Sequence, residues 1–524
     1  MKLDRTLAII LTLAIAVSFA NIGGLDIYAL DEAKNAEAAR HMFVSGDYVV
    51  PSYNGEVRTD KPPLHYYFMS LGYGLFGVNP FGARFMSSVF GVLTVLLVYL
   101  FGIKHFNQQT AIYSSLVLIS SLHFNLQMHM SVPDPYLIFF LTWAFFSFYN
   151  AYQSDGFWAK ISFYFAIGCG LLLKGPIALG LTGLTALIFL LLKKDFKWPT
   201  VWRLQPFGGL ILSLAIALPW YYAVHQATDG FWTEEFFFKH NFSRYSDAME
   251  GHNGIFLLTL AYVFVLGMLT MLPVVFQSFK WAILKRSNDA LFYVFTGASV
   301  IIAFFASSST KLPNYTTPSY PLISLLLGYY ISNIKVSWYK GIGNKIGYYF
   351  YAILMLIFPA GLYLGLKGDP NLAHLSYLGL YFIPLSFLGA YLFYQGIKGK
   401  SVILAMQASM VVWTTTTLLF FYLIFPQVDA ENPTRKLIPY MDTQAEIISY
   451  KRLNAAFVFE LQREIPKYNE IKDIREAIAS APKGYVISRR SFREELEQIE
   501  ELSYVDECKD TFENPTSLLM KWGD

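Results

Sequence analysis

Long apolar runs are the feature that most constrains the fold of this chain. Thirteen such runs, most of them close to 20 residues long, lie between residues 6 and 425. A helix needs roughly 20 apolar residues to cross a bilayer. Only 15% of the residues are charged and the mean hydropathy is +0.40, whereas a soluble domain carries about 25% charged residues. The sequence therefore predicts an all-α polytopic membrane protein.

The predicted spans are 6–24, 80–103, 108–128, 133–153, 159–173, 176–193, 205–225, 255–277, 289–307, 316–335, 346–366, 374–396 and 401–425. The first run follows Lys2 and Arg5 and also resembles a signal peptide that is cleaved after export. No convincing small-x-small cleavage site precedes Asn21, and many spans follow. We therefore expect a first transmembrane helix with its N-terminus inside.

Charges in the loops predict the orientation. The loops on one side hold most of the cations: Lys104, Lys160, Lys193, Lys194, Lys197, Arg203, Lys280, Lys285, Arg286, Lys335, Lys340, Lys345, Lys398 and Lys400. The short loops of the other side hold little beyond Lys174, Lys311 and Lys367. By the positive-inside rule the N-terminus is cytoplasmic. Thirteen is odd, so the C-terminus is expected outside, in the periplasm of a bacterium whose inner membrane holds the chain.

Two domains are predicted. Residues 1–425 form the transmembrane domain, with long outer loops at 25–79 and 226–254. The first loop contains two helix-like stretches, at 28–45 and after Lys61-Pro62-Pro63, because prolines are tolerated at a helix start.

The polar tail, residues 426–524, is predicted to be a small soluble α/β domain. Apolar strand-like runs at 457–459 and 485–488 alternate there with a helix-like run at 492–501. Cys169 and Cys508 are the two cysteines and are expected to be unpaired. The net charge of +3, without an extended basic patch, argues against nucleic-acid binding.

Ionisable residues are unusually dense in the first outer loop. Six carboxylates and four cations fall between Asp31 and Lys61. Such clusters at a membrane surface indicate a site for a charged ligand.

Two aspartates are candidates for catalysis. Asp31 could deprotonate or orient an acceptor hydroxyl, or it could simply be an acid at a helix start facing water. Asp134 lies between Pro133 and Pro135 at the outer mouth of the fourth span, where an acid is usually functional. The alternative for Asp134 is capping of the helix.

Phosphate and metal binding are also suggested by residue type. Lys61 is a compact cation suited to a phosphate oxygen, and Lys34, Arg40 and Arg58 add positive charge. The alternative for Lys61 is an ordinary surface pair with Asp60.

Asp60 with His240, or with His252, supplies the ligand types that zinc prefers. No H-x-x-x-H or C-x-x-C spacing supports a metal, and a single histidine is more often a hydrogen-bonded loop residue. Tyr315, before the tenth span, could reach the site, although aromatic residues are common at membrane interfaces.

Five short motifs, in order, resemble the membrane glycosyltransferases of the GT-C class. The branch that contains the aminoarabinose transferases of lipid A is most similar, and protein mannosyltransferases are more distant. That family's D-E-A-R-Y-A-E-I-A pattern is matched by residues 31–39, its E-K-P-P-L by 60–64 and its P-D by Pro133-Asp134. Its K-G-P is matched by residues 174–176 and its L-P-x-Y by 312–315.

Two positions depart from the family's pattern. Lys34 replaces an arginine, which loses a bidentate phosphate clamp. Asp60 replaces a glutamate and is one methylene shorter, which puts the family's metal site in doubt. The histidine ligand of the family maps to His240, with His252 as the alternative.

The resemblance implies transfer of a sugar from a polyprenyl (undecaprenyl) phosphate donor to a lipid A-type acceptor at the outer membrane surface. Asp31, Asp134 and Lys61 are then the catalytic residues. The donor phosphate is expected at Lys61, Lys34, Arg58 and Tyr315, and a divalent metal such as zinc at Asp60 and His240. No nucleotide or organic cofactor is expected, and the partners are the donor, a glycolipid or protein acceptor and the bilayer.

Two alternatives stay open. A protein O-mannosyl- or glycosyltransferase of the same class differs only in acceptor. A lipid or solute transporter usually has charges at mid-membrane and internal repeats. Here the charges gather on one face and no repeat is visible.

Overall fold

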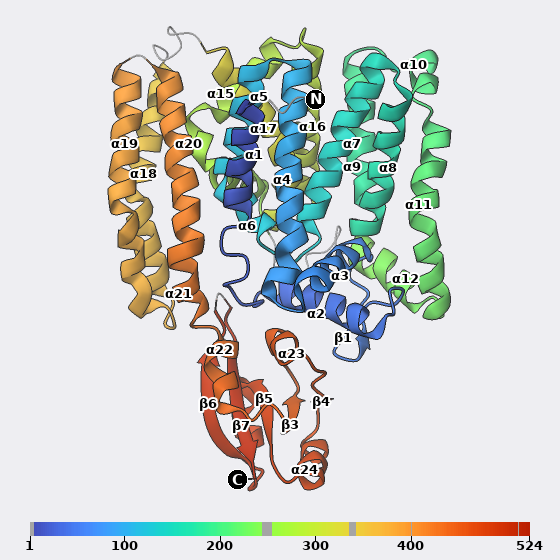
Figure 1. The fold of residues 1–524 in the computed structure, drawn as a ribbon, viewed down its shortest axis with the longest axis vertical. Helices are drawn as coiled ribbons and strands as arrows, with labels where there is room; N and C mark the ends of the chain where they lie inside the picture. Colours follow the sequence, from blue (N-terminus) through green and yellow to red (C-terminus); the bar gives the residue numbers. More distant parts are fainter. Residues whose placement is uncertain (1–4, 244–253, 335–341, 400, 512, 524) are drawn as a thin grey trace.

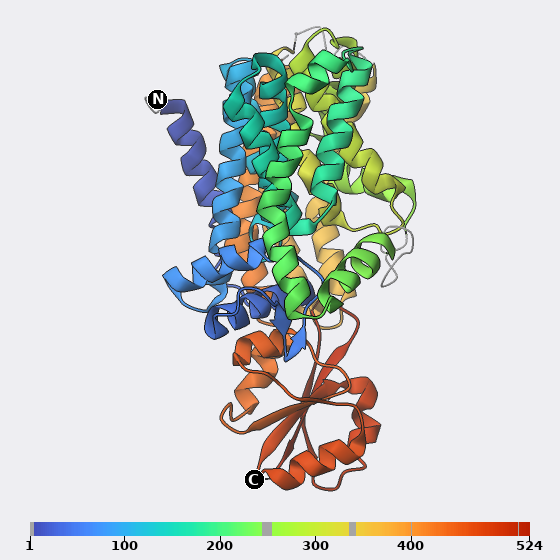
Figure 2. The same cartoon turned by 90° about the vertical axis from the view of Figure 1, so that its right-hand side faces the viewer.

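A long helical bundle carries a small α/β unit at one end (Figures 1 and 2). The computed structural model describes residues 5–243, 254–334, 342–399, 401–511 and 513–523. The α/β unit lies at the end of the bundle opposite α10 (Trp198–Arg203). Helix α10 belongs to one of the loops that were predicted to be cytoplasmic.

Helices make up the bundle, with several short 3-10 or π-helical segments labelled η. They are α1 (Arg5–Ser18), α4 (Pro80–His105), α5 (Gln108–Ser120), α6 (Leu122–Met128), α7 (Asp134–Ser154), α8 (Phe157–Lys174), α9 (Ile177–Leu192), α11 (Pro206–Ala227), α12 (Phe231–Glu234), η1 (Glu235–Ser243), α14 (Phe256–Ala261), η2 (Tyr262–Gly267), η3 (Leu269–Met271), α15 (Leu272–Leu284), α16 (Asp289–Ser307), η4 (Pro313–Ser319), α17 (Tyr320–Ser332), α18 (Ile342–Gly368), η6 (Ala373–Phe382), α19 (Ile383–Lys398), α20 (Val402–Leu419), η7 (Phe420–Ile424) and α21 (Phe425–Asp429).

Many of these helices suit a membrane. Within the described ranges, seven are long and apolar enough to cross one, or up to eight if the pair Phe256–Gly267 and Leu269–Leu284, bent by 80°, forms one span. Each predicted span coincides with a helical segment, but the number thirteen stays a prediction. Large apolar side chains such as Phe350, Ile353 and Ile357 of α18 are more than half exposed, as expected of a surface that faces lipid.

The first outer segment lies across the end of the bundle. It consists of α2 (Leu30–Ser45), a hairpin of β1 (Ser52–Tyr53) and β2 (Glu56–Val57), and α3 (Leu64–Phe76). Asn54 and Gly55 form the hairpin turn with φ of 50° and 80°. Asn-Gly is the residue pair that a two-residue turn with two positive φ angles favours.

A buried ion pair fixes the start of α2 against α4. Arg84 Nε and Nη2 donate to the two carboxylate oxygens of Glu32 at 2.7 and 2.9 Å. The same guanidinium donates to the carbonyl oxygens of Ile22, Leu25 and Asp26 at 2.7–3.0 Å. Glu32 also accepts from the backbone of Ser131, before α7, at 2.9 Å. One arginine therefore joins three segments of the chain.

The C-terminal unit is built on a five-stranded sheet. Its elements are α22 (Pro433–Leu437), η8 (Ile438–Tyr440), β3 (Glu446–Tyr450), α23 (Ala456–Leu461), β4 (Lys467–Tyr468), α24 (Ile471–Ser480), β5 (Gly484–Arg489), η9 (Arg490–Phe492), α25 (Arg493–Leu496), β6 (Ser503–Lys509) and β7 (Thr516–Trp522). The strand order is β4-β3-β5-β7-β6. β3 is parallel to β4 and β5, while β7 is antiparallel to β5 and β6. The domain boundary at residue 426 stays a prediction.

Two predictions for the tail were wrong in detail. Residues 457–459, predicted as a strand, lie in helix α23, which is buried on two sides. A short apolar run buried on both sides has no periodicity that separates helix from strand. The helix expected at 492–501 is reduced to Arg493–Leu496, after a 3-10 turn. The strand expected at 485–488 lies within β5.

The C-terminal unit contacts the first outer segment directly. Asn54 in the hairpin turn donates to the carbonyl of Ile465 at 3.0 Å and accepts from its amide at 2.7 Å. Ala456 and Phe459 of α23 share an apolar cluster with α2 and α3. Arg435 pairs with Asp26 at 2.7 Å. The unit is thus held on the outer segment by apolar contact, hydrogen bonds and charge.

Glu460 in α23 should make this contact pH-dependent. Burial, and then the charge of Asp26, raises the pKa of Glu460 to about 7, against the attraction of Arg435 and Arg84. A carboxyl whose pKa is raised on folding binds more protons in the folded state below pH 7. Its contribution to the free energy of unfolding therefore increases as pH falls from about 7 to 4.5, by about 1–3 kcal/mol.

The measurement is thermal unfolding at pH 5.5 and 8.0 for the wild type and Glu460→Gln. We expect the variant to be the more stable protein at pH 8.0 and to have a weaker pH dependence. Identical pH profiles for the two proteins would contradict the assignment to Glu460.

Candidate functional site

The N-terminus of α2 presents two acids in opposite directions. Asp31 and Glu32 both lie in the first turn, where carboxylates are favoured by the helix dipole. The Asp31 side chain is 65% exposed, whereas Glu32 is buried in its pair with Arg84. Glu32 is therefore a structural residue, and Asp31 is the one that can meet a ligand.

Asn35, one turn along α2, organises the groups next to Asp31. It is fully buried, and its amide donates to the carbonyl of Asp31 at 2.7 Å. Its carbonyl oxygen lies 3.3 Å from each of three polar atoms, on Arg58, His65 and Tyr66. This amide therefore joins α2 to the loop before α3 and to α3 itself.

Arg58 is the central cation of the cluster. Its guanidinium is buried, lies 3.2 Å from Asp60 and 3.7 Å from Asp31, and donates to Tyr66 at 3.1 Å. Trp232 of α12 donates to the Arg58 carbonyl at 2.8 Å. An arginine stays protonated at any relevant pH, so a fixed positive charge lies beside the exposed carboxylate of Asp31.

His65 is neutral at pH 7. Burial, and then the charges of Arg58, Lys61 and, more weakly, Lys174, hold its pKa well below the usual value. Lys61 is itself buried, with 8% of its surface exposed. The charges of Arg58, Lys61 and Lys174 therefore all act on one buried imidazole.

A second cluster surrounds Asp134. Its carboxylate is 7% exposed and accepts from Lys174 Nζ at 2.8 Å. The Lys174 ammonium also lies 5.1 Å from the centre of the Tyr315 ring. Asp134 is in the first turn of α7, whose cap position is Pro133 and has no side-chain capping bond. The capping alternative for Asp134 is thus not what the geometry shows.

The structure brings most of the predicted site residues into these two clusters. Arg58 pairs with both Asp31 and Asp60, and Lys61 follows Asp60 just before α3. Lys34 lines a cavity together with Arg58. His240 lies in η1, but its side chain, like all of His252, is outside what the structure describes.

A metal site is not visible around Asp60. Among the described residues, no group of three or more His, Cys, Asp and Glu side chains could hold an ion. Asp60 faces Arg58 instead, and His65 nearby is surrounded by cations. These surroundings do not fit a divalent cation. Zinc at Asp60 and His240 stays a prediction of the resemblance.

Four residues at the centre of the clusters were missing from the predicted site: Asn35, His65, Tyr66 and Lys174. Position offers some signal for two of them, since His65 is four residues after Lys61 and Lys174 lies at the end of a span. Asn35 and Tyr66 have no such signal, because their roles depend on contacts between separate segments.

A family model described as dolichyl-phosphate-mannose-protein mannosyltransferase matches residues 60–222. This range contains Lys61, Asp134 and Lys174, so the family match includes residues of both clusters. It covers less than half of the chain.

Curated relatives are 28% identical. One is an uncharacterised protein of Aquifex aeolicus, aligned over 341 residues, which are 65% of this chain and 74% of the relative. Another is the undecaprenyl phosphate-alpha-4-amino-4-deoxy-L-arabinose arabinosyl transferase of Yersinia pestis, aligned over 58% of this chain. The chain spans about half the length of this transferase, 55%.

A solved structure is similar over almost the whole chain. The crystal structure of ArnT from Cupriavidus metallidurans bound to undecaprenyl phosphate superposes with a TM-score of 0.79, covering 98% of this chain and 97% of that one at 19% identity. The superposed part of this chain therefore includes almost all of the C-terminal unit.

At 19% identity this similarity establishes the fold alone. The resemblance seen in the motifs is confirmed: this chain is a multi-pass membrane protein with the fold of the GT-C glycosyltransferases, and it is similar to their aminoarabinose transferase branch.

Proposed function

We propose that this protein transfers a sugar from a polyprenyl phosphate donor, such as undecaprenyl phosphate, to a lipid A-type acceptor on the outer face of the inner membrane. The observation that carries the proposal is an exposed carboxylate, Asp31, 3.7 Å from the buried cation Arg58, in the first turn of α2 at the end of the bundle next to the C-terminal unit (Figure 1). Relatives whose names specify undecaprenyl phosphate support the donor class.

The proposed reaction is a single displacement at the anomeric carbon. The acceptor oxygen forms a bond to this carbon while the bond from the carbon to the phosphate oxygen breaks, with inversion of configuration. Asp31 takes the acceptor proton or, if the acceptor group is already an anion, orients it. Lys61 stabilises the charge that grows on the departing phosphate.

Asp134 has a separate role in this proposal. Its pair with Lys174 holds that ammonium beside Tyr315 and within electrostatic reach of His65. Lys174 is thus a second fixed cation that can face the donor, and Asp134 positions it.

A protein acceptor is the second candidate, since the matching family model is named for protein mannosyltransferases. A transporter is less consistent with the structure, because α2 and α3, which flank the Asp31–Arg58 cluster, lie at one end of the bundle rather than at its middle (Figure 1).

Donor choice tests the function. The purified protein in nanodiscs, with lipid A as acceptor, is expected to use a polyprenyl phosphate sugar and to ignore UDP- and GDP-sugars. Nucleotide sugars remain in the cytosol, so an outward-facing site requires a lipid-carried donor. Efficient transfer from a nucleotide sugar would contradict the proposal, and mass spectrometry of the product identifies the sugar and the acceptor.

Sidedness tests the proposed orientation. Glu56 in the hairpin and Lys197 before α10 are both exposed and lie at opposite ends of the bundle. Single cysteines at these positions, with the buried Cys169 and Cys508 replaced by alanine, are treated with a membrane-impermeant thiol reagent after outer-membrane permeabilisation. We expect labelling at position 56 and none at 197; the reverse pattern would invert the topology.

Lys61→Ala should impair use of the donor. Loss of a charge-assisted hydrogen bond costs about 1.5–3 kcal/mol, so we expect kcat/KM for the donor to fall about 10- to 150-fold. The loss should be the same for donors with different sugars, because the phosphate is their common part. An unchanged kcat/KM would exclude Lys61 from the phosphate site.

A further inference from the structure

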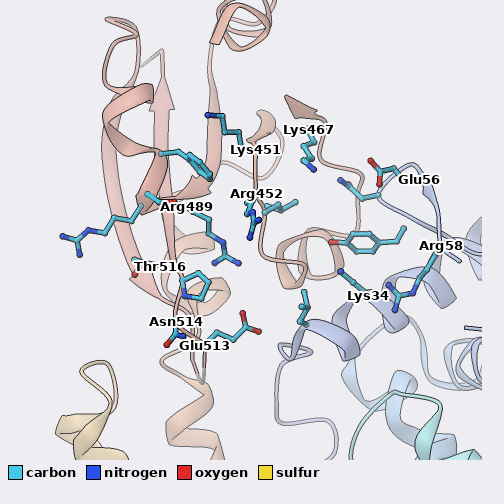
Figure 3. A pocket seen from close by; sticks show the side chains of 18 of the residues that line it. Lys34, Glu56, Arg58, Lys451, Arg452, Lys467, Arg489, Glu513, Asn514 and Thr516 are labelled. Atoms are coloured by element: carbon cyan, nitrogen blue, oxygen red, sulfur yellow. The ribbon is translucent and has the colours of Figure 1, made fainter. Parts of the chain in front are cut away.

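A large cavity lies between part of the C-terminal unit and part of the first outer segment, beside the contacts that join them. Its volume is about 1250 Å³, and its walls come from α2 and the hairpin on one side and from the ends of β3, β4 and β5 on the other. Figure 3 shows Lys34 and Arg58 on the first wall, facing Arg452 and Lys467 on the second. The cavity is larger than the roughly 300–1,000 Å³ that a typical small ligand occupies.

Positive charge predominates around the cavity. Seven Lys or Arg and four Asp or Glu side chains line it. Several of the cations are neutralised by structural partners. Lys451 binds Glu495 at 2.6 Å, Arg490 lies 3.3 Å from Glu507, and Arg489 pairs with the buried Asp510.

Among the described residues, three cations of the lining form no ion pair, and neither do three acids, Glu56, Glu494 and Glu513. Within the described ranges, Lys34, Arg452 and Lys467 form no ion pair with a carboxylate within 4.0 Å. Arg452 and Lys467 are exposed, and Lys34 is half-buried. Arg452 follows Lys451, which has a left-handed φ of 57°. Such backbone strain costs about 1–3 kcal/mol and tends to persist at ligand-binding sites.

This cavity overlaps the predicted donor-phosphate site only in part. Lys34 and Arg58, both predicted for the donor phosphate, line it, whereas Lys61 and Tyr315 do not. The reacting group Asp31 is 3.7 Å from Arg58, so the cavity opens beside the catalytic acid. A headgroup bound here would lie between Arg58, next to Asp31, and the C-terminal unit.

We propose that the C-terminal unit forms the outer wall of the acceptor site, and that Arg452 and Lys467, with Lys34 opposite, bind a phosphate on the saccharide headgroup of the acceptor. The inference rests on the proposed function for the identity of the reaction. Guanidinium binds phosphate in a bidentate manner, and lysine adds a point charge.

The test compares the double variant Arg452→Gln/Lys467→Gln with the wild type in nanodiscs. We expect KM for phosphorylated lipid A to rise at least 10-fold, with kcat and KM for the donor unchanged. Lipid A from which the phosphates have been removed should bind equally well to both proteins. The matched control is Lys472→Gln/Lys483→Gln, two exposed lysines of the same unit that do not line the cavity.

Direct binding separates a failure of this inference from a failure of the proposed function. Fluorescent lipid A in detergent is titrated with each protein, and phosphatidylglycerol at the same charge serves as a competitor. Weaker binding by the cavity variant, without transfer by the wild type, would support the site and refute the reaction. Transfer with an unchanged acceptor KM would refute the site, as would equal displacement by phosphatidylglycerol, which indicates general anion binding.

Discussion

Asp31→Asn is expected to lower the rate of sugar transfer at least 100-fold while leaving the protein folded. General base catalysis typically contributes 10²–10⁴-fold, and asparagine keeps the shape of the side chain but cannot take a proton. Because the Asp31 side chain is 65% exposed, the change should affect stability only through the helix dipole, by about 0.3–1 kcal/mol. Transfer rates and thermal unfolding, measured on the same preparation, check both parts.

Asp47→Asn is a suitable control for Asp31→Asn. Asp47 is an exposed acid just beyond the other end of α2, and it accepts from the amides of Val49 and Val50. We expect it to retain transfer within about twofold of the wild type. If Asp31→Asn also retained such activity with an unchanged pH optimum, Asp31 would have no role in the chemistry. A shifted pH optimum with an unchanged maximal rate would instead indicate that Asp31 orients an ionised acceptor.

The location of the site could be predicted from sequence because its charged residues lie in short ordered motifs. Asp31, Arg58 and Asp60 were predicted from residue type, and in the structure both acids pair with Arg58. Their chemistry is encoded locally, in acids and cations placed next to helix starts and prolines. What the sequence could not indicate is which acid faces solvent. Asp31 and Glu32 are adjacent, and only the contact of Glu32 with Arg84 distinguishes them.

The residues that were missed share a physical property. Asn35 is an uncharged amide inside a helix, and its importance comes from neighbours more than 20 residues away, Arg58 and Tyr66. Lys174 meets Asp134 across 40 residues. Long-range contacts of this kind have no periodic or compositional signal, so they are visible only in the folded chain. The same reason explains the strand predicted at residues 457–459, which burial on two sides converts to a helix.

Arg84→Met is expected to have the largest effect on stability, lowering the free energy of unfolding by about 3–5 kcal/mol. That is the usual cost of removing one partner of a buried ion pair, because the other charge is left uncompensated. Here the remaining charge is Glu32, which is 3% exposed. Arg84→Lys should be nearly as damaging, since one ammonium cannot replace donors that reach Glu32 and three separate carbonyls. Thermal unfolding in detergent, followed by size-exclusion chromatography, measures the loss.

The double variant Glu32→Gln/Arg84→Met separates charge burial from hydrogen bonding. If the uncompensated charge is the main cost, the double variant should be more stable than Arg84→Met alone. It should not regain the wild-type value, because the carbonyls of Ile22, Leu25 and Asp26 still lack a donor. A double variant no more stable than Arg84→Met would mean that the carbonyl contacts carry the effect. Either way transfer should fall, since the Glu32–Arg84 pair holds the first turn of α2 and thereby turns Asp31 outward.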